Sequence, residues 1–393
     1  MLKPLRIGLL WHSLRAGNLG VGALTLGNMA IIRQVAEEMG REIKFIVLSM
    51  RESSTNPIAE GVEQYEIDTK RMLLPSGYRA KVGTLDCVID IGAGDSFADI
   101  YGKKRFGFMW LSKHWAIAQH VPLILAPQTI GPFTKALYRP FAASVMAKAA
   151  AVVARDEQSL AAIRELAPEA DAHLSVDVAF KLPFEDRSAL RGGDGKKRIG
   201  INVSGLLCKQ AESGENRFGL SYDYLALHRR LIAHFIARGD CEVHLVTHAN
   251  SIGDQGDDDG TRADMLKAEF PEAIRVPDFA GPAEAKSYIS SMDFAVAGRM
   301  HACIAAFSSA TPVVPTAYSR KFSGLFSLLG YPHYTPVSGI TEDEAFAMIL
   351  DGFENRAALE QNERHSLETV DQKLDSYRDV LRREFARIGG SAA

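Results

Sequence analysis

Arg299 and His301 are the most concentrated pair of reactive side chains in the sequence, within the segment Gly298-Arg299-Met300-His301. The planar guanidinium of an arginine suits carboxylates and phosphates, and an imidazole titrates near neutral pH. We expect this turn to join a strand to a helix, whose first N–H groups and dipole also favour an anion. The segment therefore predicts an anion site that contains an acid–base group. A purely structural histidine is the alternative.

Lys321, Tyr318 and His248 follow other predicted strands in the same half of the chain. Lys321 is expected to open the helix of the next strand–helix unit and to add a positive charge beside Arg299, because parallel strands end at one edge of a sheet. His248 ends its strand and is the alternative acid–base group. His244 shares a strand face with His248, but a histidine in the core and one at the strand end do not predict a zinc site.

A glycine-rich turn follows the first predicted strand and contains Gly17, Asn18 and Gly20. Glycines let the backbone approach an anion at the N-terminus of the helix that comes next. The spacing differs from the GxGxxG pattern, and no acidic residue ends the second strand, so the turn does not predict a dinucleotide site. The alternative is a tight turn that binds no ligand.

Two further strand ends in the first half carry glycine and small polar side chains, with Gly94 and Asp95 at one and Gln128 at the other. Open α/β sheets bind their ligands at this edge, so Asp95 or Gln128 is placed to meet a sugar hydroxyl. In the alternative interpretation, Asp95 caps a turn and Gln128 bridges backbone groups.

Arg155 follows the last predicted strand of the first half. We expect its guanidinium to face the ligand crevice, where it would suit a carboxylate or a phosphate. An ion pair with Asp177 is the structural alternative. The next residue, Asp156, has the type and position of a helix N-cap.

The elements that position these residues alternate between short apolar runs and amphipathic stretches, which is typical of strand–helix units wound on parallel sheets. The expected strands are 6–10, 44–48, 87–91, 122–126, 151–154, 199–203, 242–247, 294–297 and 313–316. The expected helices are 22–39, 135–148, 156–166, 222–238, 261–270, 283–291, 300–308 and 321–329, followed by a helical C-terminus.

A chain of 393 residues is long enough for two domains of this kind. A polar, glycine-rich linker at 181–197 would separate a domain at 1–180 from one at 198–341, and C-terminal helices at 342–393 would pack back across both. The predicted fold class is α/β, with two Rossmann-like doubly wound domains that face a central cleft. This is a GT-B-like arrangement with a C-terminal helical segment.

The overall charge and the apolar runs exclude several classes of protein. Lys and Arg total 45 against 48 Asp and Glu, a balance that argues against nucleic-acid binding and makes any anion site local. The longest nearly apolar stretch, 142–154, is too short to span a bilayer, so no transmembrane segment is expected. The four cysteines show no CxxC spacing, which favours reduced thiols and a cytoplasmic location.

Together, these segments resemble the polysaccharide pyruvyl transferase family over most of the chain. The glycine turn departs from the family's pattern at Val21, where an acidic residue usually stands. The segments that carry the resemblance are Gly17-Asn18-x-Gly20, Gly92-x-Gly94, Gln128-Thr129-Ile130-Gly131-Pro132, Arg155-Asp156-x-x-Ser159, Asp177-x-Ala179-Phe180, His248 with Asp258, Gly298-Arg299-x-His301 and Tyr318-x-x-Lys321-x-x-Gly324.

The resemblance implies transfer of an enolpyruvyl group from phosphoenolpyruvate onto sugar hydroxyls of a polysaccharide precursor, with ketal closure and phosphate release. It implies that Arg299, Lys321 and Arg155 bind the donor in the second domain and that His301 transfers the proton. Tyr318 and His248 would also contact substrate, and the first domain would hold the acceptor. The reaction needs no cofactor or metal. A lipid-linked acceptor with peripheral membrane contact is one possibility, in exopolysaccharide and cell-envelope synthesis. The oligomeric state is not predicted.

Two other functions fit the same architecture. A nucleotide-sugar glycosyltransferase would bind a diphosphate at the same helix N-terminus and release a nucleotide. The second half, however, offers no evident carboxylate pair to bind a ribose. A catalytically silent glycan-binding protein would keep the fold without turnover, and Val21 is the feature that points to it.

Overall fold

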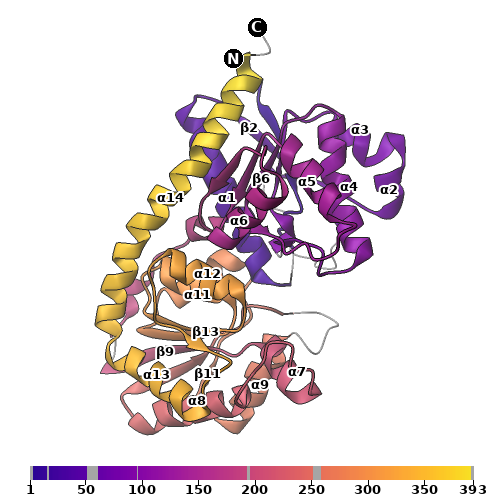
Figure 1. Ribbon diagram of the computed structural model, residues 1–393. Helices are drawn as coiled ribbons and strands as arrows, with labels where there is room; N and C mark the ends of the chain where they lie inside the picture. The colour runs from indigo at the N-terminus through magenta and orange to yellow at the C-terminus, as the bar shows by residue number, and fades with distance from the viewer. Residues whose placement is uncertain are drawn as a thin grey trace. The chain divides into compact units, whose positions relative to one another are not determined.

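The chain of this computed structural model divides into two compact units, which we describe separately (Figure 1). The structure describes residues 3–15, 17–50, 61–94, 96–192, 195–250 and 258–390, without the side chains at 96, 320, 321, 323 and 390. Unit 1 comprises Met1–Ala16, Leu24–Lys181 and Val370–Ala393, and unit 2 comprises Gly17–Ala23 and Leu182–Thr369.

Unit 1 is built on a parallel sheet, whose strands in the described residues follow the order β3-β2-β1-β4-β6-β7-β8, with β5 paired to β6. Its central strands are apolar and buried because helices cover both faces of such a sheet. The strands are β1 (Leu5–Leu10), β2 (Ile43–Ser49), β3 (Glu63–Glu66), β4 (Cys87–Asp90), β5 (Ser96–Phe97), β6 (Leu123–Ile130), β7 (Ala151–Ala154) and β8 (Ala172–Leu174).

The helices of unit 1 follow these strands along the chain. In α6, Asp156 is the N-cap, as its type predicts, and its carboxylate accepts a hydrogen bond from Ser159 N at 2.8 Å. The helical segments are α1 (Leu19–Glu38), α2 (Thr69–Leu73), η1 (Pro75–Arg79), α3 (Ala80–Val82), η2 (Gly92–Gly94), α4 (Lys103–Ala118), α5 (Arg139–Lys148), α6 (Glu157–Leu166) and η3 (Val178–Lys181). The residues of α1 up to Ala23 belong to unit 2.

Helix α1 is the one helix of the described chain that is long and apolar enough to cross a membrane by those two criteria. Of its apolar window, 67% is buried inside the protein. Asn28 of this helix is buried and its side-chain oxygen accepts a hydrogen bond from the Tyr377 hydroxyl at 2.8 Å. Its burial is therefore typical of a core helix.

Unit 2 contains a second parallel sheet, whose described strands follow the order β11-β10-β9-β12-β13-β14. The strands are β9 (Lys197–Asn202), β10 (Cys241–Leu245), β11 (Ile274–Arg275), β12 (Phe294–Ala297), β13 (Val313–Ala317) and β14 (Thr335–Pro336). The helical segments are η4 (Ser188–Leu190), α7 (Gly205–Ser213), α8 (Tyr224–Arg238), α9 (Asp259–Glu269), α10 (Pro282–Ile289), α11 (Met300–Ser308), α12 (Arg320–Leu328) and α13 (Glu342–Glu354).

The polar stretch after Leu182 is attached along unit 2. The Arg191 guanidinium donates hydrogen bonds to the Ala310, Ser309 and Ser290 carbonyl oxygens at 2.8, 3.0 and 2.9 Å. The Leu182 carbonyl oxygen accepts a hydrogen bond from the Lys286 ammonium group at 3.1 Å. These contacts explain why the division between the units falls at Lys181 and not within the glycine-rich sequence.

The C-terminal segment is helical, as predicted, and consists of α13 and the long helix α14 (Arg356–Gly390). A capping box starts α13, in which Thr341 and Glu344 exchange hydrogen bonds. Residues of α14 before Val370 belong to unit 2 and the later ones to unit 1. The two doubly wound α/β units and the C-terminal helices confirm the predicted fold class. The central cleft and the roles assigned to the two halves stay predictions.

Candidate anion-binding and acid–base site

Three loops of unit 2 meet at the carboxyl ends of its central strands. Asn202 is the last residue of β9, His248 follows β10, and Arg299 follows β12 as the N-cap of α11. Strands β10, β9 and β12 are neighbours in the sheet. The fold therefore brings two of the predicted site residues, Arg299 and His248, to one edge.

The Arg299 guanidinium forms a buried ion pair with Asp259. Nη2 and Nε of Arg299 lie 2.8 and 3.0 Å from the same Asp259 carboxylate oxygen. The side chains are only 8% and 1% exposed. A buried charge is held in this way because an unpaired one would lose its hydration without compensation.

Asp259 also binds the loops around it. One carboxylate oxygen accepts from Gly205 N at 3.0 Å, and the other accepts from the Asn202 side chain at 3.0 Å and from His248 N and Ala249 N, each at 3.1 Å. The carboxylate thus fixes the ends of β9 and β10 as well as the arginine. Asp259 is buried, although it stands in an acidic run whose sequence is typical of a solvated loop. Its neighbour Asp258 caps α9.

Asn202 orients the backbone that precedes α11. Its side-chain oxygen accepts a hydrogen bond from Arg299 N at 3.0 Å, and its side-chain nitrogen donates to the Val246 carbonyl oxygen at 3.0 Å. Sequence reasoning did not single out Asn202 or Asp259. The sequence did carry a signal for both residues. Asn202 lies near the end of the predicted strand 199–203, and Asp259 lies just before the predicted helix 261–270.

The glycine turn after β1 belongs to unit 2 and lies against His301. A Cβ atom added to Gly20 would lie 2.3 Å from His301 Nδ1, so only glycine allows this approach. The Asn18 side-chain oxygen accepts from Gly20 N at 2.9 Å, and Leu19 N donates to the His248 carbonyl oxygen at 3.1 Å. The Gly17 carbonyl oxygen accepts from Asn250 N at 3.0 Å.

These bonds correct one expectation about Gly17, Asn18 and Gly20. We expected the first amides of the following helix to be open to an anion. Instead, Leu19 N and Gly20 N have the partners just named, and Val21 N donates to the Asn18 carbonyl oxygen at 3.2 Å. Leu19 N thus attaches the turn to the loop after β10, and the other two amides bond within the turn.

The two imidazoles of the site differ in exposure. His248 is 2% exposed, and burial, together with the nearby His301 and Arg299, lowers its pKa from 6.5 to about 3. It is therefore neutral at physiological pH and is no proton donor there. His301 lies in the first turn of α11 and is partly exposed. His301 is therefore the more exposed of the two residues, although its Nε2 atom is buried.

Tyr318 and Lys321 follow β13, the strand next to β12. The Tyr318 ring packs against Phe218 and Phe322, with centroids 4.8 and 5.0 Å away. Lys321 is the second residue of α12, and its side chain lies outside the part of the chain that the structure describes. Its predicted charge beside Arg299 stays a prediction.

Gln128, Gly94 and Arg155 belong to unit 1. The Gln128 amide donates to the Asp90 carbonyl oxygen at 3.0 Å and to its carboxylate at 2.9 Å, so it bridges strand ends as in our structural alternative. Gly94 ends the short helical turn η2. Asp95 lies outside the described residues.

Arg155 also follows the structural alternative. Its Nη1 lies 2.6 Å from the Asp177 carboxylate, and its Nε donates to the Thr129 hydroxyl at 2.9 Å. The side chain is 4% exposed. The expectation that its guanidinium faces an open crevice is therefore wrong, because these buried partners hold it inside unit 1.

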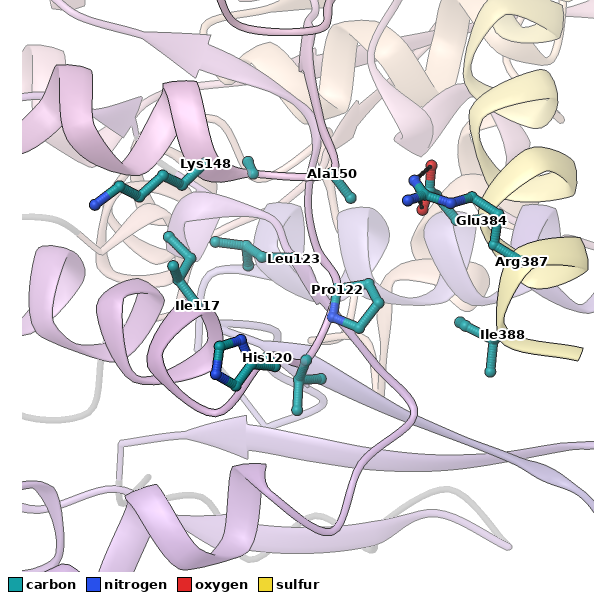
Figure 2. Close-up of a pocket in the computed structure, with 11 residues that line it drawn as sticks. Ile117, His120, Pro122, Leu123, Lys148, Ala150, Glu384, Arg387 and Ile388 are labelled. Atoms are coloured by element: carbon teal, nitrogen blue, oxygen red, sulfur yellow. Dashed lines mark hydrogen bonds and ion pairs between the residues drawn. The ribbon is translucent and has the colours of Figure 1, made fainter. Parts of the chain in front are cut away.

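A pocket of about 580 Å³ in unit 1 lies elsewhere (Figure 2). It is lined by Pro122 and Leu123 at the amino end of β6, by Ala150 before β7 and by residues of α14. Figure 2 shows Glu384 and Arg387 of α14 paired at its side, with Nη1 3.2 Å from the carboxylate. Because ligands of open α/β sheets bind at the carboxyl ends of the strands, this pocket is not part of the candidate site.

Solved structures of similar fold include a UDP complex, a putative epimerase and a glycosyl-group transferase named for forosamine. The S. aureus MnaA–UDP structure has a TM-score of 0.55 at 10% identity and covers 91% of this chain and 90% of that one. A putative UDP-N-acetylglucosamine 2-epimerase from Listeria monocytogenes has 0.55 at 10% identity, covering 99% and 97%. The spinosyn forosaminyltransferase SpnP has 0.54 at 12% identity, covering 98% and 100%. These likenesses establish the GT-B-like fold alone.

The sequence comparisons identify the family. No individual curated protein matches the chain significantly. The family model described as polysaccharide pyruvyl transferase matches residues 18–320. That range contains Asn18 and Gly20 of the glycine turn, Asp259, Arg299 and His301, all of which belong to unit 2. The chain therefore belongs to the polysaccharide pyruvyl transferase family.

Proposed function

We propose that the protein transfers an enolpyruvyl group from phosphoenolpyruvate to sugar hydroxyls of a polysaccharide precursor and closes it to a ketal. Family membership supports a transferase of this kind. The observation that carries the proposal is the fixed Arg299–Asp259 pair beside the partly exposed His301, at the carboxyl edge of one sheet. An anchored cation and an imidazole beside it are two groups that this chemistry needs.

The donor carries a carboxylate and a phosphate, so it needs cations and N–H donors in one place. Asp259 holds one edge of the Arg299 guanidinium, and a guanidinium has five N–H donors in all. The first turn of α11 adds the backbone N–H groups that every helix N-terminus presents. We propose that Lys321, at the start of the neighbouring helix α12, supplies the second positive charge.

His301 is the proposed proton carrier. It gives a proton to the methylene carbon of the enolpyruvyl group, which becomes a methyl group, and the adjacent carbon takes on positive charge. One sugar hydroxyl adds to that carbon, phosphate leaves, and a second hydroxyl adds to close the ketal. The two hydroxyl protons balance the reaction, because one restores His301 and the other leaves with phosphate. A general acid–base group such as the one proposed for His301 typically raises the reaction rate by about 10²–10⁴-fold.

The deciding experiment measures what the protein releases from each class of donor. Purified protein is incubated with phosphoenolpyruvate, or with UDP-sugars, and with a panel of nucleotide-linked and lipid-linked sugar acceptors. Phosphate release with a ketal-bearing product supports the proposal. Nucleotide release from a UDP-sugar would identify a glycosyltransferase instead. Binding of glycans with neither release would identify a catalytically silent protein.

We also propose a cytoplasmic location. The four cysteines, Cys87, Cys208, Cys241 and Cys303, are all buried and free of disulfides, which suits a reducing compartment. Detection of the reduced protein in the soluble or inner-membrane-associated cytoplasmic fraction tests this, and recovery from an oxidising compartment contradicts it.

A further inference from the structure

Positive charge is concentrated in one stretch of unit 1. Residues 100–155 contain eight Lys and Arg residues and no Asp or Glu, although Asp and Glu outnumber Lys and Arg in the whole chain. Two of the eight, Lys113 and Arg155, are buried and paired inside the unit. Lys103, Lys104 and Lys135 are exposed, and neither Lys103 nor Lys104 forms an ion pair with any described residue.

Large apolar side chains are exposed in the same stretch. Ile100 is 55% exposed and Tyr101 38%, both just before α4, and Leu137 is 70% and Phe141 41% exposed, at the start of α5. Single exposed apolar residues are common on proteins. Here, four of them lie among lysines at the starts of two adjoining helices. An exposed apolar cluster of this kind marks a surface that binds a partner or a membrane.

The two segments form one surface, because contacts hold them together. The Asp99 carboxylate accepts hydrogen bonds from Lys135 N at 2.7 Å and from the Thr134 hydroxyl at 3.2 Å. The rings of Trp110 in α4 and Phe141 in α5 lie 5.1 Å apart. Helices α4 and α5 lie side by side in Figure 1. We call this the α4–α5 surface, comprising Ile100, Tyr101, Leu137, Phe141, Lys103, Lys104 and Lys135.

We propose that the α4–α5 surface binds an anionic lipid membrane. Lysines attract the negative headgroups, and the exposed apolar side chains enter the boundary between headgroups and acyl chains. An acidic protein partner fits less well, because lysine is depleted from the cores of protein–protein interfaces. The proposal does not depend on pyruvyl transfer, although it would bring the enzyme to a lipid-linked acceptor.

The test is sedimentation with vesicles of phosphatidylcholine, with and without 30–40% phosphatidylglycerol as roughly the fraction of anionic lipid that gives a strong surface potential. We expect the full-length protein to bind the anionic vesicles, and to bind less as salt is raised. The double variant Lys103→Gln/Lys104→Gln should partition about 30-fold less strongly, since each lysine near the surface contributes about a fivefold effect. Leu137→Ser should lower partitioning by about tenfold.

Matched controls have the same changes at exposed positions outside the α4–α5 surface. Lys44→Gln/Lys196→Gln removes the same charge, and Leu190→Ser, at a site 51% exposed, removes the same side chain. All variants should keep the melting temperature of the parent protein, because the altered side chains are exposed. Absence of binding to anionic vesicles would overturn the proposal and leave an acidic protein as the partner. Equal losses in the control variants would overturn it as well.

Discussion

Gly20 lies so close to His301 that a Cβ atom at position 20 would be 2.3 Å from the imidazole Nδ1. Gly20, which the sequence suggested as part of an anion-binding turn, therefore packs directly against the imidazole of the candidate acid–base site. Gly20→Ala should push the imidazole aside and lower turnover by about 100-fold, the cost of misplacing a reacting group by about 1 Å. Phosphate-release kinetics measure this. Gly107→Ala, where nothing lies within 4 Å, should leave turnover unchanged.

His301→Gln tests the proton carrier itself. The amide keeps a polar side chain but cannot deliver the proton, so turnover should fall by about 10²–10⁴-fold while phosphoenolpyruvate affinity and melting temperature change little. His365→Gln is the matched control, because that imidazole is 84% exposed. Near-parental turnover in folded His301→Gln protein would remove His301 from the mechanism.

Asp259→Ala should destabilise unit 2 strongly. It leaves the Arg299 guanidinium buried without its carboxylate, and such a change costs about 3–5 kcal/mol in the free energy of unfolding. Denaturant titration measures the loss. Asp264→Ala, in the same helix, breaks only an exposed ion pair with Arg275 and should cost about 0–1 kcal/mol. Similar losses in the two variants would contradict the role assigned to Asp259.

Phosphoenolpyruvate should stabilise the folded protein by mass action. At 100 times its dissociation constant, the free energy of unfolding should rise by about 2.7 kcal/mol, visible as a higher melting temperature. Lys321→Ala should remove most of that shift if this lysine supplies the second charge. Lys196→Ala, at an exposed position, should keep the shift. A full shift in Lys321→Ala would locate the donor's second cation elsewhere.

Acid should weaken unit 2 through its buried histidines. Burial lowers the pKa of His228 to about 4 and that of His248 to about 3, against 6.5 in the unfolded chain. The unfolded state therefore takes up protons first, and stability falls as pH drops from 6.5 towards 4, by roughly 1.4 kcal/mol per pH unit for each histidine. Urea titrations at several pH values measure the slope. His228→Gln should reduce it.

The sheets were predictable where burial leaves a plain apolar run. The central strands β1, β4, β6 and β12 have such runs, and each was expected within a few residues. The edge strands β3 (Glu63–Glu66) and β11 (Ile274–Arg275) were not predicted, because they are short, partly exposed and partly polar. Their strand state comes from pairing with a neighbour, which local sequence does not reveal.

The candidate site was predictable only for the residues that stand together in one segment of the sequence. Arg299 and His301 stand together at a strand–helix turn, so residue types and spacing were sufficient. Asp259 was missed because it lies 40 residues away in an acidic run whose sequence is typical of an exposed loop. The attachment of the glycine turn to unit 2 was missed for the same reason, since the bridge between Asn18 and Ala249 joins distant segments.

The division of the chain also bears on how the protein is synthesised. Unit 1 needs Tyr377, which is fully buried and donates its hydroxyl hydrogen to Asn28, whose amide lies against the buried ring of His12. A ribosome makes the sheet of unit 1 first and Tyr377 only after all of unit 2 has been made. The core of the nascent first half therefore stays incomplete while residues 182–369 are made, and its maturation depends on completion of the chain. Cutting the gene after Lys181 would leave that first half permanently unfinished.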